Sequence, residues 1–253
     1  MALFNLGTLS STPVVENNFS LTTTDPTDVF QFKITSYKNI NLSLTDISAG
    51  DDADIGLFLD ANSNGVLDNF DRIFGFVSTK GSNLDEAINI QTDTSTYFAE
   101  VSRFAPRSSG NVSYDLALSA TEPSGTFPLS ASFSNLLPKE FLVGNLLGDI
   151  TRTGNVSHIN TTDVYSFSLG SFEGVNIKLD GLSSDADIRL IRDFNNNRIV
   201  DAGEEIARST KGGINSELIS NINKSGDYFL QVTEFEASTN YNLTFNQFTT
   251  TFA

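Results

Sequence analysis

The chain has 253 residues, more than the ~100–150 at which single domains are most common, so its length predicts two domains. It carries 31 acidic against 15 basic residues, and this net charge of −16 disfavours nucleic acid and anionic lipid as partners while it attracts cations. There is no cysteine, which excludes disulfide bonds and thiolate metal sites.

The first residues show no targeting signal. No basic residue precedes Lys33, and no long apolar stretch occurs near the start of the chain. The sequence therefore predicts neither a signal peptide nor membrane insertion. Secretion would require either a leader that has already been removed or an export route without a classical leader.

Short alternating segments follow along the first half. Residues 28–34 and 41–44 place apolar side chains at every second position, which is the period of a half-buried β-strand. Seven or eight such runs occur in each half, separated by glycine, asparagine, aspartate and serine. We therefore expect an all-β fold, an antiparallel sandwich in which two sheets, each apolar on one face, pack these faces against each other.

Residues 60–71 form the strongest local motif. They place oxygen-bearing side chains at positions 1, 3, 5, 9 and 12 of a twelve-residue loop, with Gly65 at position 6, where the chain must turn sharply. This is the ligand spacing of a calcium loop, in which position 7 adds a backbone carbonyl. The expected ligands are Asp60, Asn62, Asn64, Val66 through its carbonyl, Asp68 and Asp71.

The second half of the chain repeats the first. Asp-Val-Phe-Gln-Phe at 28–32 returns as Asp-Val-Tyr-Ser-Phe at 163–167, and Asp-Ala-Asp-Ile at 52–55 returns unchanged at 185–188. Later blocks match in the same order at slightly smaller shifts, so the second copy is a little shorter. We interpret the repeat as two tandem domains.

The predicted boundary lies near residue 120. Residues 119–126 are rich in turn formers and are interpreted as the linker. We expect a first domain over residues 1–120, which contains loop 60–71. The linker and the second domain then occupy residues 121–253, which contain loop 193–204.

Loop 193–204 keeps oxygen-bearing groups at the same positions as the first loop. The expected ligands are Asp193, Asn195, Asn197, Ile199 through its carbonyl, Asp201 and Glu204. Arg198 replaces the glycine at position 6, where a positive φ would cost about 1 kcal/mol. A simple hairpin turn at Asn64-Gly65 is the alternative, but it explains neither the three acids in each loop nor their retention without the glycine. The two loops therefore predict two Ca²⁺ sites.

Asp54 and Asp187 each precede a loop by six residues. We interpret them as supporting or ordinary strand carboxylates rather than calcium ligands.

Three ordered motifs carry a family resemblance: the Asp-Val-(Phe/Tyr)-x-Phe strand, the Asp-Ala-Asp-Ile strand leading into the acidic loop, and a late Tyr-Phe-x-x-Val strand followed by Tyr-x-Leu. With them, each half resembles a bacterial pre-peptidase C-terminal domain. The resemblance implies jelly-roll-like β-sandwiches attached to secreted bacterial proteases and other extracellular proteins, and related modules bind calcium or matrix polymers. The loops also resemble those of dockerins, although strands rather than helices are expected to flank them here.

The sequence offers no convincing catalytic site. A nucleophilic triad needs a general base, and the one histidine, His158, has Thr23 as its counterpart in the first half. Asp93 has no matching carboxylate in the second half, which argues against an aspartic dyad. A glycosidase or lyase that uses two carboxylates is the enzymatic alternative, because acids are plentiful. We expect a protein that is not an enzyme.

The expected function is that of a secreted or cell-surface calcium-binding protein, acting as a non-catalytic binding or accessory module. Its partners would be calcium and an extracellular polysaccharide or protein. The alternative is a self-assembling structural protein of the cell surface or extracellular matrix. Exposed aromatic residues on a sheet face would favour the first function, and exposed edge strands would favour the second.

Overall fold

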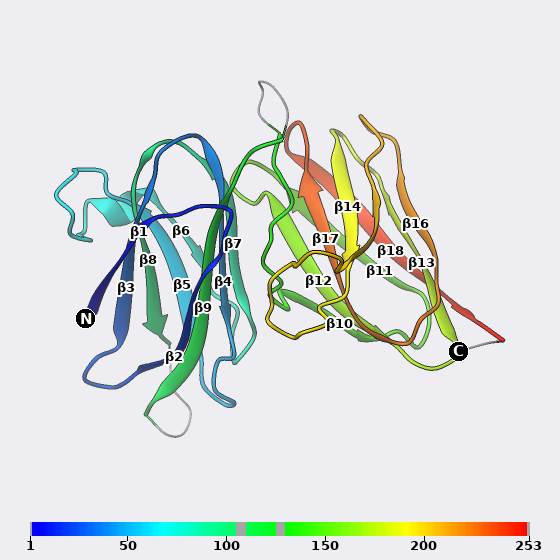
Figure 1. The fold of residues 1–253 in the computed structure, drawn as a ribbon, viewed down its shortest axis with the longest axis horizontal. Helices are drawn as coiled ribbons and strands as arrows, with labels where there is room; N and C mark the ends of the chain where they lie inside the picture. Colours follow the sequence, from blue (N-terminus) through cyan, green and yellow to red (C-terminus); the bar gives the residue numbers. More distant parts are fainter. Residues whose placement is uncertain (1, 105–109, 125–129, 252–253) are drawn as a thin grey trace. The chain divides into compact units, whose positions relative to one another are not determined.

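The computed structural model describes residues 2–104, 110–124 and 130–251 (Figure 1). The regular secondary structure of this part is β-strand apart from one short 3₁₀ helix, η1 (Asp71–Phe74), and the predicted fold class is confirmed. The chain divides into two compact units, Met1–Glu122 and Pro123–Ala253. No helix in the described ranges is long and apolar enough to cross a membrane.

The first unit is a sandwich of two sheets. One sheet has the strand order β1-β3-β8-β5-β6, and the other has the order β2-β9-β4-β7. The strands are β1 (Ala2–Thr8), β2 (Val14–Leu21), β3 (Thr27–Ile34), β4 (Lys38–Thr45), β5 (Ala53–Leu59), β6 (Gly75–Ser78), β7 (Glu86–Thr92), β8 (Ser95–Arg103) and β9 (Val112–Thr121).

The second unit has the same strand order with each strand number raised by nine. Its sheets run β10-β12-β17-β14-β15 and β11-β18-β13-β16. The strands are β10 (Phe141–Asn145), β11 (Ile150–Val156), β12 (Thr162–Leu169), β13 (Glu173–Asp180), β14 (Ala186–Ile191), β15 (Glu205–Ser209), β16 (Glu217–Ile222), β17 (Gly226–Glu234) and β18 (Thr239–Thr249).

One strand pair in each unit is parallel. β1 pairs with β3, and β10 pairs with β12, in parallel orientation. The other strand pairs of the described chain are antiparallel. A parallel pair needs a crossover rather than a hairpin, and β2 and β11 supply it by passing through the opposite sheet.

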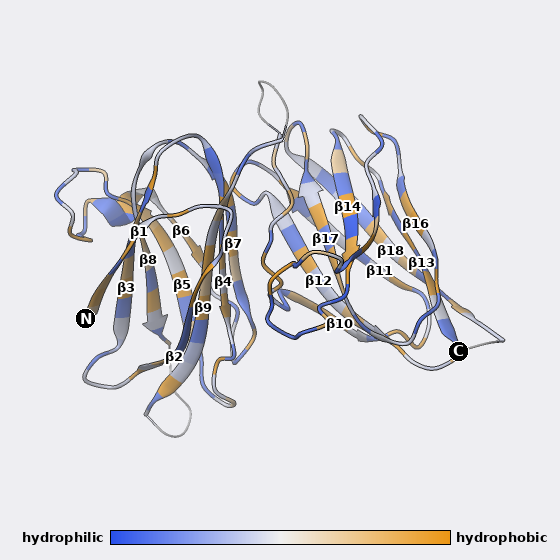
Figure 2. Cartoon of the chain, viewed as in Figure 1, coloured by the Kyte–Doolittle hydropathy of each residue, from blue (hydrophilic) through white to orange (hydrophobic). Residues whose placement is uncertain are grey.

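Alternation along the strands builds the core of each sandwich. In the first unit, Phe30 and Phe32 of β3 meet Leu42 of β4 and Leu116 of β9, and all four are fully buried. The second unit has an equivalent core that includes Phe167 of β12. Figure 2 shows the same alternation as orange and blue bands along the strands. One face of each sheet is thereby fixed inward, which leaves the other face available for loops.

Part of the predicted linker, residues 119–126, belongs to a strand. Residues 119–121 form the end of β9, where they pair with β4. Ser124 then bridges to Ser130, and residues 125 and 126 lie outside the described part of the chain. The strand therefore continues further than the turn-forming composition predicts, because the hydroxyls of Ser119 and Thr121 accept hydrogen bonds from Asn41 of the neighbouring strand β4.

Candidate functional site

Loop 60–71 connects β5 to β6 and folds over the outer face of the first five-stranded sheet. It begins directly after β5, and its last residue starts η1. Leu67, at loop position 8, packs beneath it against Val29, Phe58 and Phe98. This small apolar cluster anchors the loop to the sheet, so the polar positions on either side of Leu67 are held in a defined conformation.

The two ends of this loop are tied by carboxylates. Asp60 accepts hydrogen bonds from the backbone N–H groups of Asn64 and Gly65, both at 3.1 Å. Asp71, which is fully buried, accepts one from Ala61 at 2.9 Å and one from Asp68 at 3.0 Å. Positions 1 and 12 therefore organise the backbone of the whole loop.

Positions 3, 5 and 9 converge on one point. The side-chain amides of Asn62 and Asn64 both donate to Oδ2 of Asp68, each at 2.9 Å. These two hydrogen bonds, together with one from the backbone N–H of Phe70, hold the pKa of Asp68 below its usual value. The three side chains predicted as ligands at these positions are thus brought together in the structure.

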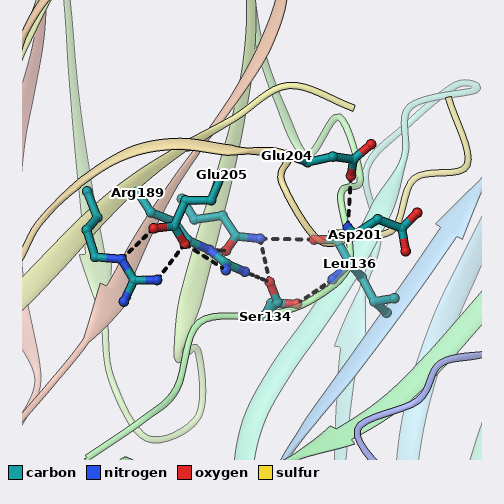
Figure 3. Close-up of polar contacts among 8 residues, drawn as sticks. Ser134, Leu136, Arg189, Asp201, Glu204 and Glu205 are labelled. Carbon is teal, nitrogen blue, oxygen red and sulfur yellow. Dashed lines mark hydrogen bonds and ion pairs between the residues drawn. The ribbon is translucent and has the colours of Figure 1, made fainter. Parts of the chain in front are cut away.

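Loop 193–204 connects β14 to β15 and repeats this pattern position by position. Asp193 accepts from the N–H groups of Asn197 at 3.2 Å and Arg198 at 3.0 Å. Glu204 accepts from Phe194 at 2.8 Å and Asp201 at 2.9 Å, the latter drawn in Figure 3.

The inner positions of the second loop also match. The amides of Asn195 and Asn197 both donate to Oδ2 of Asp201 at 2.8 Å. Two loops that differ in eight of the twelve residue types, including glycine against arginine at position 6, therefore adopt one hydrogen-bonding scheme.

The predicted backbone conformation at position 6 is confirmed in both loops. Gly65 has φ 72° and Arg198 has φ 61°, so the arginine adopts the left-handed conformation despite its Cβ. Its guanidinium donates to the carbonyl of Leu137 at 3.0 Å, and its own carbonyl accepts from the N–H of Leu137 at 2.9 Å. These contacts offset the strain.

Position 7 is fixed by its N–H group in each loop. Val66 donates to Oδ1 of Asn64 at 2.7 Å, and Ile199 donates to Oδ1 of Asn197 at 2.9 Å. That the carbonyls of Val66 and Ile199 would bind an ion stays a prediction.

Carboxylates alone do not form a metal centre here. Among the described residues, no group of three or more histidine, cysteine, aspartate or glutamate side chains could hold a metal ion. In both loops the asparagine amides donate hydrogen bonds to the aspartate at position 9. Any ion would therefore depend on amide and carbonyl oxygens as much as on carboxylates, which is a donor set that suits a hard cation such as Ca²⁺.

A segment before β10 covers the outer sheet face of the second unit. Gln231 is fully buried and donates to the carbonyls of Ser134 at 2.8 Å and Leu136 at 3.0 Å, while Arg189 donates to Gln231 at 2.8 Å (Figure 3). Leu136 in turn bridges to Ile199. Loop 193–204 is thus held by residues 134–137 as well as by its own sheet.

Two buried glutamates escaped the sequence analysis. Glu86 accepts hydrogen bonds from the hydroxyl of Ser78 and the N–H of Lys80, and Glu217 accepts from Ser209 and Lys211 in the same way. Burial raises the pKa of Glu86 to about 7. The matching shift of 131 residues between the two sets was the signal that could have revealed them.

Asp54 and Asp187 stand near these glutamates and not beside the loops. Each occupies the start of its strand, whereas the loop follows the strand's end. Burial raises the pKa of Asp54 to about 6 and that of Asp187 to about 7. Neither residue is placed to support a loop ligand directly.

His158 contacts a buried acid. Its Nδ1 lies 3.2 Å from Oε1 of Glu234, and the imidazole itself is about half exposed. Burial raises the pKa of Glu234, and the neighbouring imidazole lowers it. The contact links the loop before β12 to the end of β17.

The fold and loops define a β-sandwich protein with two acidic, asparagine-rich loops on its sheets. Residues 161–234 match the family model of the bacterial pre-peptidase C-terminal domain. That domain is a β-sandwich module often found in secreted proteins, and the match is compatible with a non-catalytic accessory role. A comparison with curated proteins found no match.

Several solved structures share similarity with the chain. The pre-peptidase C-terminal domain of a collagenase from Bacillus anthracis is 19% identical, with 47% of this chain and 93% of that chain covered and a TM-score of 0.32. PliG of Aeromonas hydrophila, a periplasmic inhibitor of g-type lysozyme, is 16% identical, with 42% and 97% covered and a TM-score of 0.29.

Proposed function

We propose that this protein is a non-catalytic binding or accessory module of a secreted or cell-surface protein, and that each of its two loops binds one Ca²⁺ ion. The observation that carries the proposal is the shared hydrogen-bonding scheme of loops 60–71 and 193–204. The scheme survives the exchange of Gly65 for Arg198, so the preserved feature is the arrangement of oxygens rather than the ease of the turn.

Calcium would replace hydrogen bonds that now join side chains within each loop. In the first loop it would bind at the point where Asn62 and Asn64 meet Asp68, with the two amides turning their oxygens toward the ion. Asp60 and Asp71 already lie at the two ends of the loop, where they order its backbone. In turning, the two amide oxygens would release the backbone N–H groups of Asn64 and Val66, from which they now accept hydrogen bonds, so binding would exchange these contacts for contacts with the ion.

The accessory role is supported by the family match and by the absence of an obvious catalytic pair. Within the described chain, the one histidine contacts a buried glutamate, and burial raises the pKa of several carboxylates, among them Glu86 and Asp187. The net charge of −16 favours a role in which cations are held.

Calorimetric melting in calcium and in chelator tests the proposal. Extracellular calcium sites have Kd values of about 10⁻⁴ M, and calcium at ~100-fold that concentration would stabilise each site by about 2.7 kcal/mol. We expect a clear rise in melting temperature with calcium. It should be lost for the first unit in Asp60→Ala, lost for the second unit in Asp193→Ala, and unchanged in Asp93→Asn, which removes an exposed acid outside the loops. Identical melting curves in calcium and chelator would refute the calcium sites.

A further inference from the structure

A pocket of about 160 Å³ lies on the outer face of the second unit's five-stranded sheet, beside loop 193–204. Its lining includes Ser166 of β12, Phe229 of β17, and Asp193 and Arg198 of the loop. Pockets that enclose drug-sized ligands measure roughly 300–1,000 Å³. This smaller pocket therefore fits a single chemical group rather than an extended molecule.

Ser166 is an unsatisfied polar group in the wall of this pocket. The residue is only 5% exposed, and its Oγ is buried without a hydrogen-bond partner in the described chain. Leaving a buried hydroxyl unpaired destabilises the folded chain. After a rotation about χ1 that turns this oxygen toward the pocket, a ligand that supplies a donor or acceptor to it would recover part of the lost free energy.

The first unit fills the equivalent place with its own side chain. Gln31 is the counterpart of Ser166, and its Nε2 donates to the carbonyl of Gly65 at 3.2 Å. Its Oε1 accepts from Asn5 at 3.4 Å. A carboxamide thus lies between strand and loop in the first unit, and the exchange of glutamine for serine leaves this place open in the second.

The charges around the pocket favour a neutral ligand. Lys139 and Arg198 contribute two cations, and Asp193 and Asp227 contribute two carboxylates. A primary carboxamide suits this balance, because its oxygen can accept from the cations while its NH₂ group donates to a carboxylate. The hydroxyl of Ser166 can serve either end of the amide.

We infer that this pocket binds the carboxamide side chain of a glutamine or asparagine residue from a protein partner, in the place that Gln31 occupies in the first unit. The inference deepens the proposed binding role and rests on it, but it does not require calcium. The test is therefore made on the full chain with calcium both present and absent.

Propionamide, which reproduces the end of a glutamine side chain, is the probe, with propionate as its charged counterpart. We expect saturable shifts in the amide NMR signals of residues 166–168 and 196–198 with propionamide, and binding at least 10-fold weaker with propionate. Ser166→Gln should abolish these shifts by filling the pocket. Ser166→Ala, which keeps the space but loses the hydroxyl, should weaken binding by about 2–10-fold.

Two controls separate the possible outcomes. The reciprocal variant Gln31→Ser should leave the second-unit shifts unchanged, and calcium-dependent melting of each variant reports separately on the calcium sites. No saturable shift with propionamide, or the same shift in Ser166→Gln, would overturn the inference. Tighter binding of N-acetylglucosamine than of propionamide would overturn the assignment to a protein side chain and indicate an acetamido sugar instead.

Discussion

Arg198 shows that a residue with a Cβ can occupy a glycine position when its side chain is held elsewhere. Its φ of 61° is close to the 72° of Gly65. Its guanidinium reaches the carbonyl of Leu137 at 3.0 Å and lies 5.5 Å from the ring centroid of Phe229. The contacts that compensate for the strain therefore come from a segment and a strand that are distant in sequence.

This arrangement predicts that glycine at position 198 is more stabilising than alanine, which reverses the usual order of these two residues. Arg198→Ala and Arg198→Gly lose the same side-chain contacts, but only the glycine variant relieves the left-handed strain, which is worth about 1 kcal/mol. We expect the glycine variant to be more stable than the alanine variant by about this amount in urea denaturation. Gly65→Ala in the first loop should cost a similar amount.

Elsewhere in regular structure, alanine is normally the more stabilising of the two residues. If Arg198→Ala were as stable as Arg198→Gly, the left-handed conformation would not be the source of the strain.

At the scale of elements, buried glutamates fasten the connection that follows each short edge strand. Glu86 joins the end of β6 to β7 through Ser78 and the N–H of Lys80. Glu217 does the same between β15 and β16 in the second unit. Because Glu86 is fully buried and close to Asp54, its ionised form is disfavoured, and its pKa rises from 4.5 to about 7.

A raised carboxyl pKa makes the first unit less stable as pH increases. The folded state holds the Glu86 proton more tightly than the unfolded state, so this contribution is full below pH 4.5 and is lost as pH rises to about 7. The loss is on the order of 3 kcal/mol, since each pKa unit corresponds to about 1.4 kcal/mol. Glu86→Gln should therefore gain stability relative to the wild type by about this amount between pH 4.5 and pH 7.5.

Chemical denaturation at several pH values measures this difference. Glu122→Gln, which removes a carboxylate that is 74% exposed and paired with Lys38, is measured beside it as the control. A stability difference between Glu86→Gln and wild type that stays constant over the same range would contradict the predicted titration.

At the scale of the whole molecule, each unit contains its own pair of sheets and its own apolar core. A unit of this kind carries what a domain needs to fold alone. We therefore predict that residues 1–122 and 123–253, expressed separately, each give a cooperative unfolding transition and dispersed NMR spectra. An aggregated or unfolded half, with the full chain folded, would show that the units depend on each other.

The sequence by itself determined the features that depend on local order. Alternation at 28–34 predicted strands because side chains of a strand point to opposite faces. Loop spacing at 60–71 predicted which polar side chains would lie together, and that their oxygens bind calcium stays a prediction. The repeat predicted that loop 193–204 would adopt the same arrangement as loop 60–71. The structure shows the matching hydrogen bonds.

Only the tertiary structure decided the features made by residues far apart in the chain. The cover of residues 134–137 over Gln231 and the open place beside Ser166 depend on which outer sheet face a distant segment crosses. Spacing along the chain carries no information about such contacts. Burial and the position of a side chain on its sheet set the pKa of Glu86 and leave Ser166 unpaired, and both arise only when the strands have assembled.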